Sequence, residues 1–164
     1  MARIFPFRAL RYNPSRIDLW QVVTQPYDKI TPAMQERYYA ASPYNLVRII
    51  LGKPAPGDNG SNVYTRAGEA FQQWRREGIF LQDREPSVYL YSQRFELPEG
   101  WALESGKEYE RRGFIALGKL EDYEKGVVFR HEQTLSAPKT DRLNLLRATR
   151  AHFGQIFMLY SDPA

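Results

Sequence analysis

The strand pattern over residues 86–97 constrains the fold of this chain more than any other feature. In PSVYLYSQRFEL the side chains alternate, so that Tyr89, Tyr91, Gln93 and Phe95 share one face. A polar stretch, PEGWALESGKEYE, and a second strand pattern, RRGFIALGKL, follow at once, as in a hairpin with a polar tip. The aromatic face has two interpretations: it packs as core against a helix, or it stacks nucleic-acid bases.

Three segments are predicted to be helical. Thr31 and Pro32 open the first helix, because Thr can cap a helix and Pro is tolerated at its first position. Ser61 or Asn62 caps the second helix, which ends at Gly78. The apolar stripe of this second helix consists of Val63, Ala67, Ala70, Phe71 and Trp74. The third helix is expected from Thr140 to about Phe153.

The other apolar segments favour strands, and together they define the fold class. Their sequences are RIFPFRALRY, NLVRIIL, GVVFRHE and QIFMLYS. Some strands follow one another directly and others are separated by helices, which argues against a regular doubly wound sheet. We expect one α+β domain over residues 1–164, with a mixed, largely antiparallel sheet of about five to six strands and three main helices packed on it.

Composition limits the chemistry available to this chain. Cysteine is absent, which excludes disulfides, thiol catalysis and zinc–thiolate sites. Only two histidines occur, and the sequence HEQTL lacks the second histidine of a zinc helix, so no metal site is predicted. No apolar run approaches the ~18 residues of a membrane span, so we expect a soluble, cytoplasmic protein without a membrane partner. A net charge of +4 and a pI of about 9.3 permit phosphates, nucleotides or nucleic acid as partners without requiring them.

Residues 127–150, VVFRHEQTLSAPKTDRLNLLRATR, gather charged side chains around one predicted strand-to-helix turn. A helix N-terminus is electropositive, so Lys139 and Arg142 placed there favour a phosphate site beside Thr140. The alternative is that Asp141, or Glu132 across the turn, satisfies these cations as ion pairs. The spacing leaves both interpretations open.

Three residues are candidates for acid–base chemistry. Glu132 would act as a general base if partial burial raised its pKa, or it forms a salt bridge. His131 would carry a proton, or it packs beside Phe129. Asp28, in the loop QPYDK, would accept a proton from a substrate hydroxyl, or it makes its own turn hydrogen bond.

Six segments in order resemble the family numbered 1015 among the domains of unknown function. They are QPYDKIT, SPYNLVRIIL, YTRAGEAFQQWRREGIFLQD, PSVYLYSQRF, RRGFIALGKLEDYEKG and RHEQTLSAPKTDRLNLLRATRAHFGQIFMLYSDP. The positions that the resemblance marks as important are Tyr27, Asp28, Asn45, Arg48, Gln93, His131, Glu132, Thr134, Lys139, Asp141 and Arg142. Family members are usually longer, so the resemblance implies that this chain is the N-terminal portion of a longer architecture.

The resemblance implies no established activity, but a remote kinship with the ParB/sulfiredoxin fold suggests one. Proteins similar to that fold bind nucleotides, and some transfer phosphate, including a free-serine kinase. This is an analogy between folds, and no ParB or sulfiredoxin signature occurs in this sequence.

We therefore expect a nucleotide- or phosphate-binding domain with small-molecule phosphotransfer as its reaction and Mg²⁺ accompanying the nucleotide. The expected binding residues are Lys139, Arg142, Thr140, Arg48 and Thr134, and the expected catalytic residues are Glu132, His131 and Asp28. The alternatives are a non-catalytic domain that binds protein or nucleic acid, and a fragment that is inactive without a C-terminal domain. The oligomeric state is left open.

Overall fold

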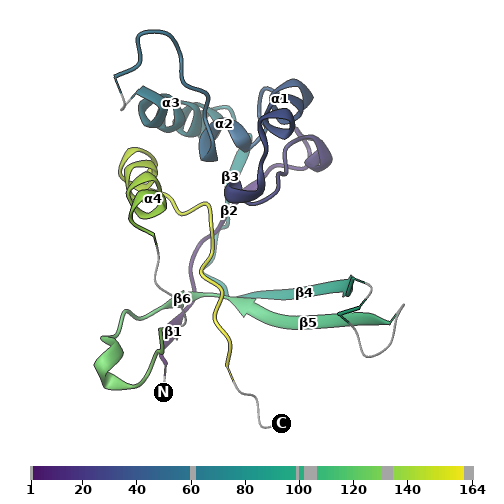
Figure 1. Ribbon diagram of the computed structural model, residues 1–164, viewed down its shortest axis with the longest axis vertical. Coiled ribbons are helices and arrows are strands. Elements are labelled where there is room, and N and C mark those ends of the chain that lie inside the picture. Colours follow the sequence, from purple (N-terminus) through teal and green to yellow (C-terminus); the bar gives the residue numbers. More distant parts are fainter. Residues whose placement is uncertain (1, 60–61, 99, 102–106, 131–134, 161–164) are drawn as a thin grey trace. The chain divides into compact units, whose positions relative to one another are not determined.

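The computed structural model describes residues 2–59, 62–98, 100–101, 107–130 and 135–160. Its chain forms two compact units, of which the hairpin unit comprises Met1–Ala9 and Asp83–His131. The helical unit comprises Leu10–Gln82 and Glu132–Ala164 (Figure 1). Each unit is described by itself below.

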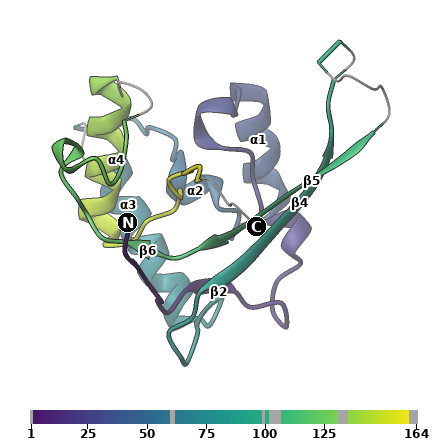
Figure 2. The ribbon, with the colours of Figure 1, turned by 90° about the horizontal axis from the view of Figure 1, so that it is seen from below.

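The hairpin unit is built on two long antiparallel strands, which form the twisted ribbon seen in Figure 2. Its elements are β1 (Ile4–Phe5), β4 (Tyr89–Glu96), β5 (Glu108–Ile115), β6 (Leu117–Gly118) and the 3₁₀ turn η3 (Tyr123–Lys125). Strands β4 and β5 pair along their whole length, from Tyr89 opposite Ile115 to Glu96 opposite Glu108. Strand β1 pairs with β6. The predicted hairpin is therefore confirmed.

Tyr89 anchors the base of this hairpin. Its hydroxyl donates to Oδ2 of Asp83 at 2.6 Å and accepts from the backbone N–H of Ala9 at 3.0 Å. Its ring lies 5.1 Å from the ring of Phe7. Tyr89 is thus part of the packing, which leaves Tyr91 and Phe95 further along the same face.

The helical unit contains four α-helices and one short sheet among its described residues. Its elements are β2 (Leu10–Tyr12), η1 (Leu19–Gln21), η2 (Tyr27–Lys29), α1 (Pro32–Ala41), α2 (Val47–Ile50), α3 (Asn62–Arg76), β3 (Phe80–Gln82) and α4 (Ser136–Thr149). Strands β2 and β3 pair antiparallel. The buried core cluster consists of Ile49, Ala67, Phe71, Trp74, Ile79, Phe80 and Leu145.

The start of α1 and the end of α3 arise from local sequence signals, as predicted, whereas Ser61, a predicted cap of α3, lies outside the described residues. The Thr31 hydroxyl accepts from the backbone N–H of Met34 at 3.3 Å, which caps α1. At the end of α3, Gly78 adopts a φ of +69°. The N–H of Ile79 then bonds to the carbonyl of Trp74 at 2.9 Å, which satisfies an otherwise orphan carbonyl.

Helices α3 and α4 approach closely at a glycine. A Cβ atom at Gly68 would lie 2.8 Å from the carbonyl oxygen of Ala148. The two small residues therefore let the backbones meet, and buried Leu145 and Thr149 pack on α4 beside this contact.

Several strand predictions are wrong. Within the predicted strand 45–51, Val47–Ile50 form helix α2, because the Asn45 side chain accepts from the N–H of Val47 at 3.0 Å and starts a helical turn. Residues 127–130 and 155–160 are not strands. The segment 155–160 is exposed, with Ile156 at 88% and Leu159 at 85%, and it belongs to none of the described sheets. The single sheet of about five to six strands is not confirmed, since the described strands pair as three two-stranded sheets.

The start of α4 also differs from the prediction. The helix begins at Ser136 and not at Thr140, with Leu135 as its N-cap. Pro138 is compatible with this start, because the first turn leaves its N–H groups without helical partners. Among the described helices, none has the length and apolar character needed to cross a membrane.

Candidate functional site

Arg142, in the second turn of α4, is held by three neighbours. Its Nε donates to Oδ2 of Asp141 at 2.7 Å, and its Nη2 contacts the same oxygen. Nη2 also donates to the carbonyl oxygen of Ile50 at 2.9 Å. The guanidinium carbon lies 3.9 Å from the centroid of the Tyr27 ring, in cation–π geometry. The side chain is therefore fixed in orientation.

Asp141 ties this arginine to α3. Its Oδ1 accepts a hydrogen bond from the Tyr64 hydroxyl at 2.8 Å. Burial, and after it the hydrogen bond to Asp141, raises the pKa of Tyr64 above its ordinary value, so the phenol stays protonated. The interpretation in which Asp141 forms an ion pair with a neighbouring cation thus holds for Arg142.

The guanidinium of Arg142 has N–H groups that these contacts do not use. Arginine has five N–H groups, and the contacts of Arg142 use those of Nε and Nη2. Within the described part of the chain, no residue accepts from Nη1. The side chain is 30% exposed, so an external acceptor can reach it.

A small hollow lies beside the guanidinium. Its volume is about 40 Å³, and its walls include Gly52, Val63, Tyr64 and Arg142. This volume admits water and is far below the roughly 300 Å³ of a small-molecule pocket. A nucleotide would therefore have to bind on the outer side of Arg142.

Two other expected binding residues, Lys139 and Thr140, lie near Arg142 on α4. Lys139 is exposed and lies three residues before Arg142, so both fall on one side of the helix. The Thr140 hydroxyl donates to the carbonyl of Ser136 at 3.0 Å, within the helix itself. Thr140 thus lies within the helix and does not open it.

Arg48 binds backbone carbonyls at the C-terminal end of α1 and does not contact Arg142. Its Nη2 donates to the carbonyl of Tyr39 at 2.8 Å and its Nε to the carbonyl of Ser42 at 3.3 Å. Its guanidinium carbon also lies 4.4 Å from the Tyr39 ring centroid. Cations suit carbonyls at a helix C-terminus, so these contacts have a structural role.

Asp28 is the exposed residue after Tyr27 in η2, and the stacking of Tyr27 on Arg142 brings their loop to α4. The other expected residues, His131, Glu132 and Thr134, lie outside the described residues. Sequence reasoning missed Tyr64 and the Ile50 carbonyl, because neither the spacing nor the composition marks them as neighbours of Arg142.

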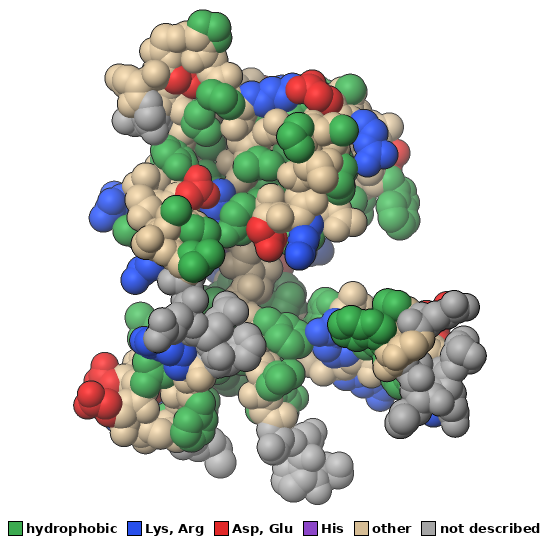
Figure 3. All heavy atoms as spheres, in the orientation of Figure 1, with side chains coloured by type: hydrophobic (Ala, Val, Ile, Leu, Met, Phe, Trp, Pro, Cys, Tyr) green, Lys and Arg blue, Asp and Glu red, His purple; other side chains and the backbone are tan. Residues whose placement is uncertain are grey.

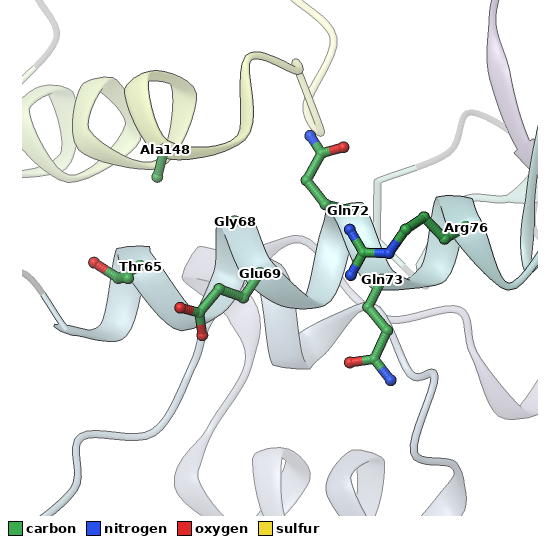
Figure 4. Close-up of a pocket in the computed structure, with 7 residues that line it drawn as sticks. All are labelled: Thr65, Gly68, Glu69, Gln72, Gln73, Arg76 and Ala148. Atoms are coloured by element: carbon green, nitrogen blue, oxygen red, sulfur yellow. The ribbon is translucent and has the colours of Figure 1, made fainter.

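Another hollow in the helical unit lies elsewhere, along α3 and α4. Its volume is about 470 Å³, and its lining side chains are drawn in Figure 4. They are Thr65, Gly68, Glu69, Gln72, Gln73, Arg76 and Ala148, none of them an expected site residue. The described residues contain no group of three or more His, Asp or Glu side chains arranged to hold a metal ion.

Comparison with known protein families shows which family this chain belongs to. The model of the family described as Protein of unknown function (DUF1015) matches residues 4–164. The chain belongs to the DUF1015 family. Searches of curated proteins and of solved structures returned no match. The predicted family is confirmed, whereas the remote kinship with the ParB/sulfiredoxin fold is not shown.

The region that matches the family model includes the elements that surround Arg142. The matched region of this DUF1015 chain includes Tyr27, Ile50, Tyr64 and α4. The family description supplies no activity, so any function must be argued from the side chains themselves.

Proposed function

We propose that this DUF1015 chain binds a phosphate-bearing small molecule, such as a nucleotide, on the outer side of Arg142 in α4. The observation that carries the proposal is the fixed guanidinium. Three contacts hold Arg142, and no described residue accepts from its Nη1. An arginine already held in place loses little side-chain entropy when it binds an anion, and its planar donors match phosphate oxygens.

The first turns of α4 supply further positive potential. Lys139 is exposed on the same side of the helix as Arg142. The N-cap, Leu135, offers no side-chain hydrogen bond, so the first backbone N–H groups are not capped by it. Such N–H groups carry the positive end of the helix dipole and favour an anion.

Asp141 opposes anion binding and therefore provides a sensitive test. Its carboxylate neutralises Arg142 through the ion pair, which weakens the attraction for a phosphate. Replacement by Asn removes the negative charge and keeps an oxygen that can accept from the arginine. An anion bound at Nη1 should therefore bind more tightly to Asp141→Asn.

Phosphoryl transfer is the reaction that suits such a site. The step requires mainly positioning and neutralisation of charge, so a small set of residues suffices. Asp28, next to Tyr27, is the described candidate for accepting the proton of a substrate hydroxyl. Glu132 and His131 are the other candidates, and Thr134 is a candidate for binding phosphate. Mg²⁺ would enter with the nucleotide, held by phosphate oxygens and a carboxylate.

Thermal unfolding with ATP, ADP, CTP and GTP, each with and without Mg²⁺, tests the binding. A ligand at about 100 times its Kd stabilises the native state by about 2.7 kcal/mol. We expect this stabilisation to disappear in Arg142→Gln and to grow in Asp141→Asn. Arg147→Gln is the matched control, because Arg147 is an exposed arginine of the same helix. Equal stabilisation of the wild type and Arg142→Gln would refute the proposed site.

A further inference from the structure

The two faces of the β4–β5 hairpin differ in charge. One face carries Tyr89, Tyr91, Gln93, Phe95, Tyr109, Arg111, Gly113 and Ile115, as the register requires. These eight residues include three tyrosines, a phenylalanine and an arginine, but no acid. The three acids of the hairpin strands, Glu96, Glu108 and Glu110, all lie on the other face.

Two of the three acids on that other face, Glu108 and Glu110, have a basic partner there. Glu110 lies 2.7 Å from Nη2 of Arg112 and accepts from the Ser92 hydroxyl at 2.8 Å. The hydrogen bond from Arg112, and then that from Ser92, lowers the pKa of Glu110. Arg94 lies 3.8 Å from Glu108. With two arginines and three glutamates this face has a formal charge of −1, while Arg111 makes the aromatic face positive.

The side chains of the aromatic face are joined to one another. The rings of Phe95 and Tyr109 stack with centroids 6.1 Å apart, and the Arg111 guanidinium lies 5.4 Å from the Phe95 centroid. Oε1 of Gln93 accepts from Arg111 at 2.7 Å and from the Tyr91 hydroxyl at 2.9 Å. The aromatic rings are thus held as an ordered platform and not as loose surface residues.

Gly113 leaves an opening in this platform. It lies directly opposite Tyr91, and a Cβ atom built on it would meet nothing within 4 Å. Tyr91 itself is 38% exposed. A planar group can therefore approach the Tyr91 ring over the backbone of β5. Figure 3 shows hydrophobic and basic side chains side by side over the hairpin.

We propose that the aromatic face of the β4–β5 hairpin binds single-stranded nucleic acid. One base stacks on Tyr91 in the opening at Gly113, and a second stacks at the Phe95–Tyr109 end. Arg111, between the two, contacts the backbone phosphate. The bases of a single strand are unpaired and offer planar faces, and aromatic rings beside a cation form the usual platform for them.

The absence of acids from this face of the strands distinguishes this partner from others. A surface that binds proteins through apolar contacts alone would not require all three strand acids to lie on the opposite face. A phosphate-bearing strand, by contrast, gains from a positive face and is repelled by carboxylates. The hairpin face and the Arg142 site belong to different units and share no residue, so either proposal can fail without the other.

Fluorescence anisotropy with labelled oligouridylate and oligothymidylate, each about twelve nucleotides long, tests the proposal. We expect Tyr91→Ala to weaken binding about 5- to 150-fold, the loss expected for one stacked base, and Tyr91→Phe to bind nearly as the wild type does. Arg111→Gln should weaken binding and reduce the salt slope by about 0.7. Arg112→Gln is the matched control, with the same charge change on the opposite face.

Gly113→Val separates loss of the site from loss of the fold. Valine has a higher strand propensity than glycine, so this variant should stabilise the hairpin while its side chain closes the opening. Weakened binding by a more stable protein would support the platform. The proposal is overturned by no binding up to about 100 μM protein at low salt, by equal losses in Arg111→Gln and Arg112→Gln, or by equal affinity for duplex DNA.

Discussion

Replacing Gly68 by alanine should destabilise the protein although alanine is the better helix former. In an ordinary helix interior this change gains about 1 kcal/mol of stability. At Gly68 the new Cβ would lie 2.8 Å from the carbonyl oxygen and 3.3 Å from the carbonyl carbon of Ala148. Both atoms belong to the backbone of α4, so neither can rotate away.

The magnitude follows from these opposing effects. Overpacking in a well-packed interior costs about 1–3 kcal/mol. Subtracting the propensity gain of about 1 kcal/mol leaves a net loss between roughly 0 and 2 kcal/mol. Helix α4 must move away from α3, which loosens the packing of buried Leu145 and Thr149. A loss of 1 kcal/mol would lower the Tm of a chain of this size by about 2–4 °C.

Urea unfolding followed by circular dichroism at a helical wavelength measures this loss. Gln72→Ala is the control, because Gln72 is an exposed residue one turn further along α3. It should change the free energy of unfolding by only a few tenths of a kcal/mol. A Gly68→Ala variant stabilised by the full propensity gain would show that the α3–α4 approach is not as close as described.

Two further predictions concern backbone strain and pH. Arg150 ends α4 with a φ of 56°, so Arg150→Gly should stabilise the protein by about 1 kcal/mol in urea unfolding, whereas Arg147→Gly inside the helix should destabilise it by a similar amount. The hydrogen bonds from Arg66, and then the backbone N–H of Ala55, hold the pKa of Asp58 well below its usual value of 3.8. Because the folded-state pKa is lowered, the stabilisation exists above the unfolded pKa and is lost as pH falls through the folded one. The stability difference between the wild type and Asp58→Asn should therefore shrink below about pH 4, and an unchanged difference would contradict this role.

Local signals were sufficient for the elements that they specify directly. The hairpin follows from alternation in 86–97 and the polar tip behind it, and α3 follows from its apolar stripe and Gly78. The strand predicted for residues 45–51 is wrong because β-branched side chains favour strands only when a pairing edge is available. Here the Asn45 amide begins a helical turn instead, and that side chain is 1% exposed.

In the candidate site, too, local sequence signals predicted some features and tertiary packing decided the others. The cluster of charges around α4 was visible in the sequence, and so was the alternative that Asp141 would pair with a neighbouring cation. Tyr27 and the carbonyl of Ile50 reach Arg142 from positions far away along the chain. Their contacts cannot be inferred from spacing, because they depend on how α2, η2 and α4 pack.

The sequence by itself determined the hairpin, the two best-marked helices, the absence of cysteine chemistry and the resemblance to the DUF1015 family. Turn residues, caps and periodicity act over a few residues, so these features need no knowledge of the rest of the chain. The tertiary structure alone decided that Arg142 is held by Tyr27 and Ile50 and that Arg48 closes α1. It also decided how far each hairpin side chain is exposed, with Leu90 at 93% and Tyr91 at 38%, because exposure depends on what packs against a residue and not on its neighbours in sequence.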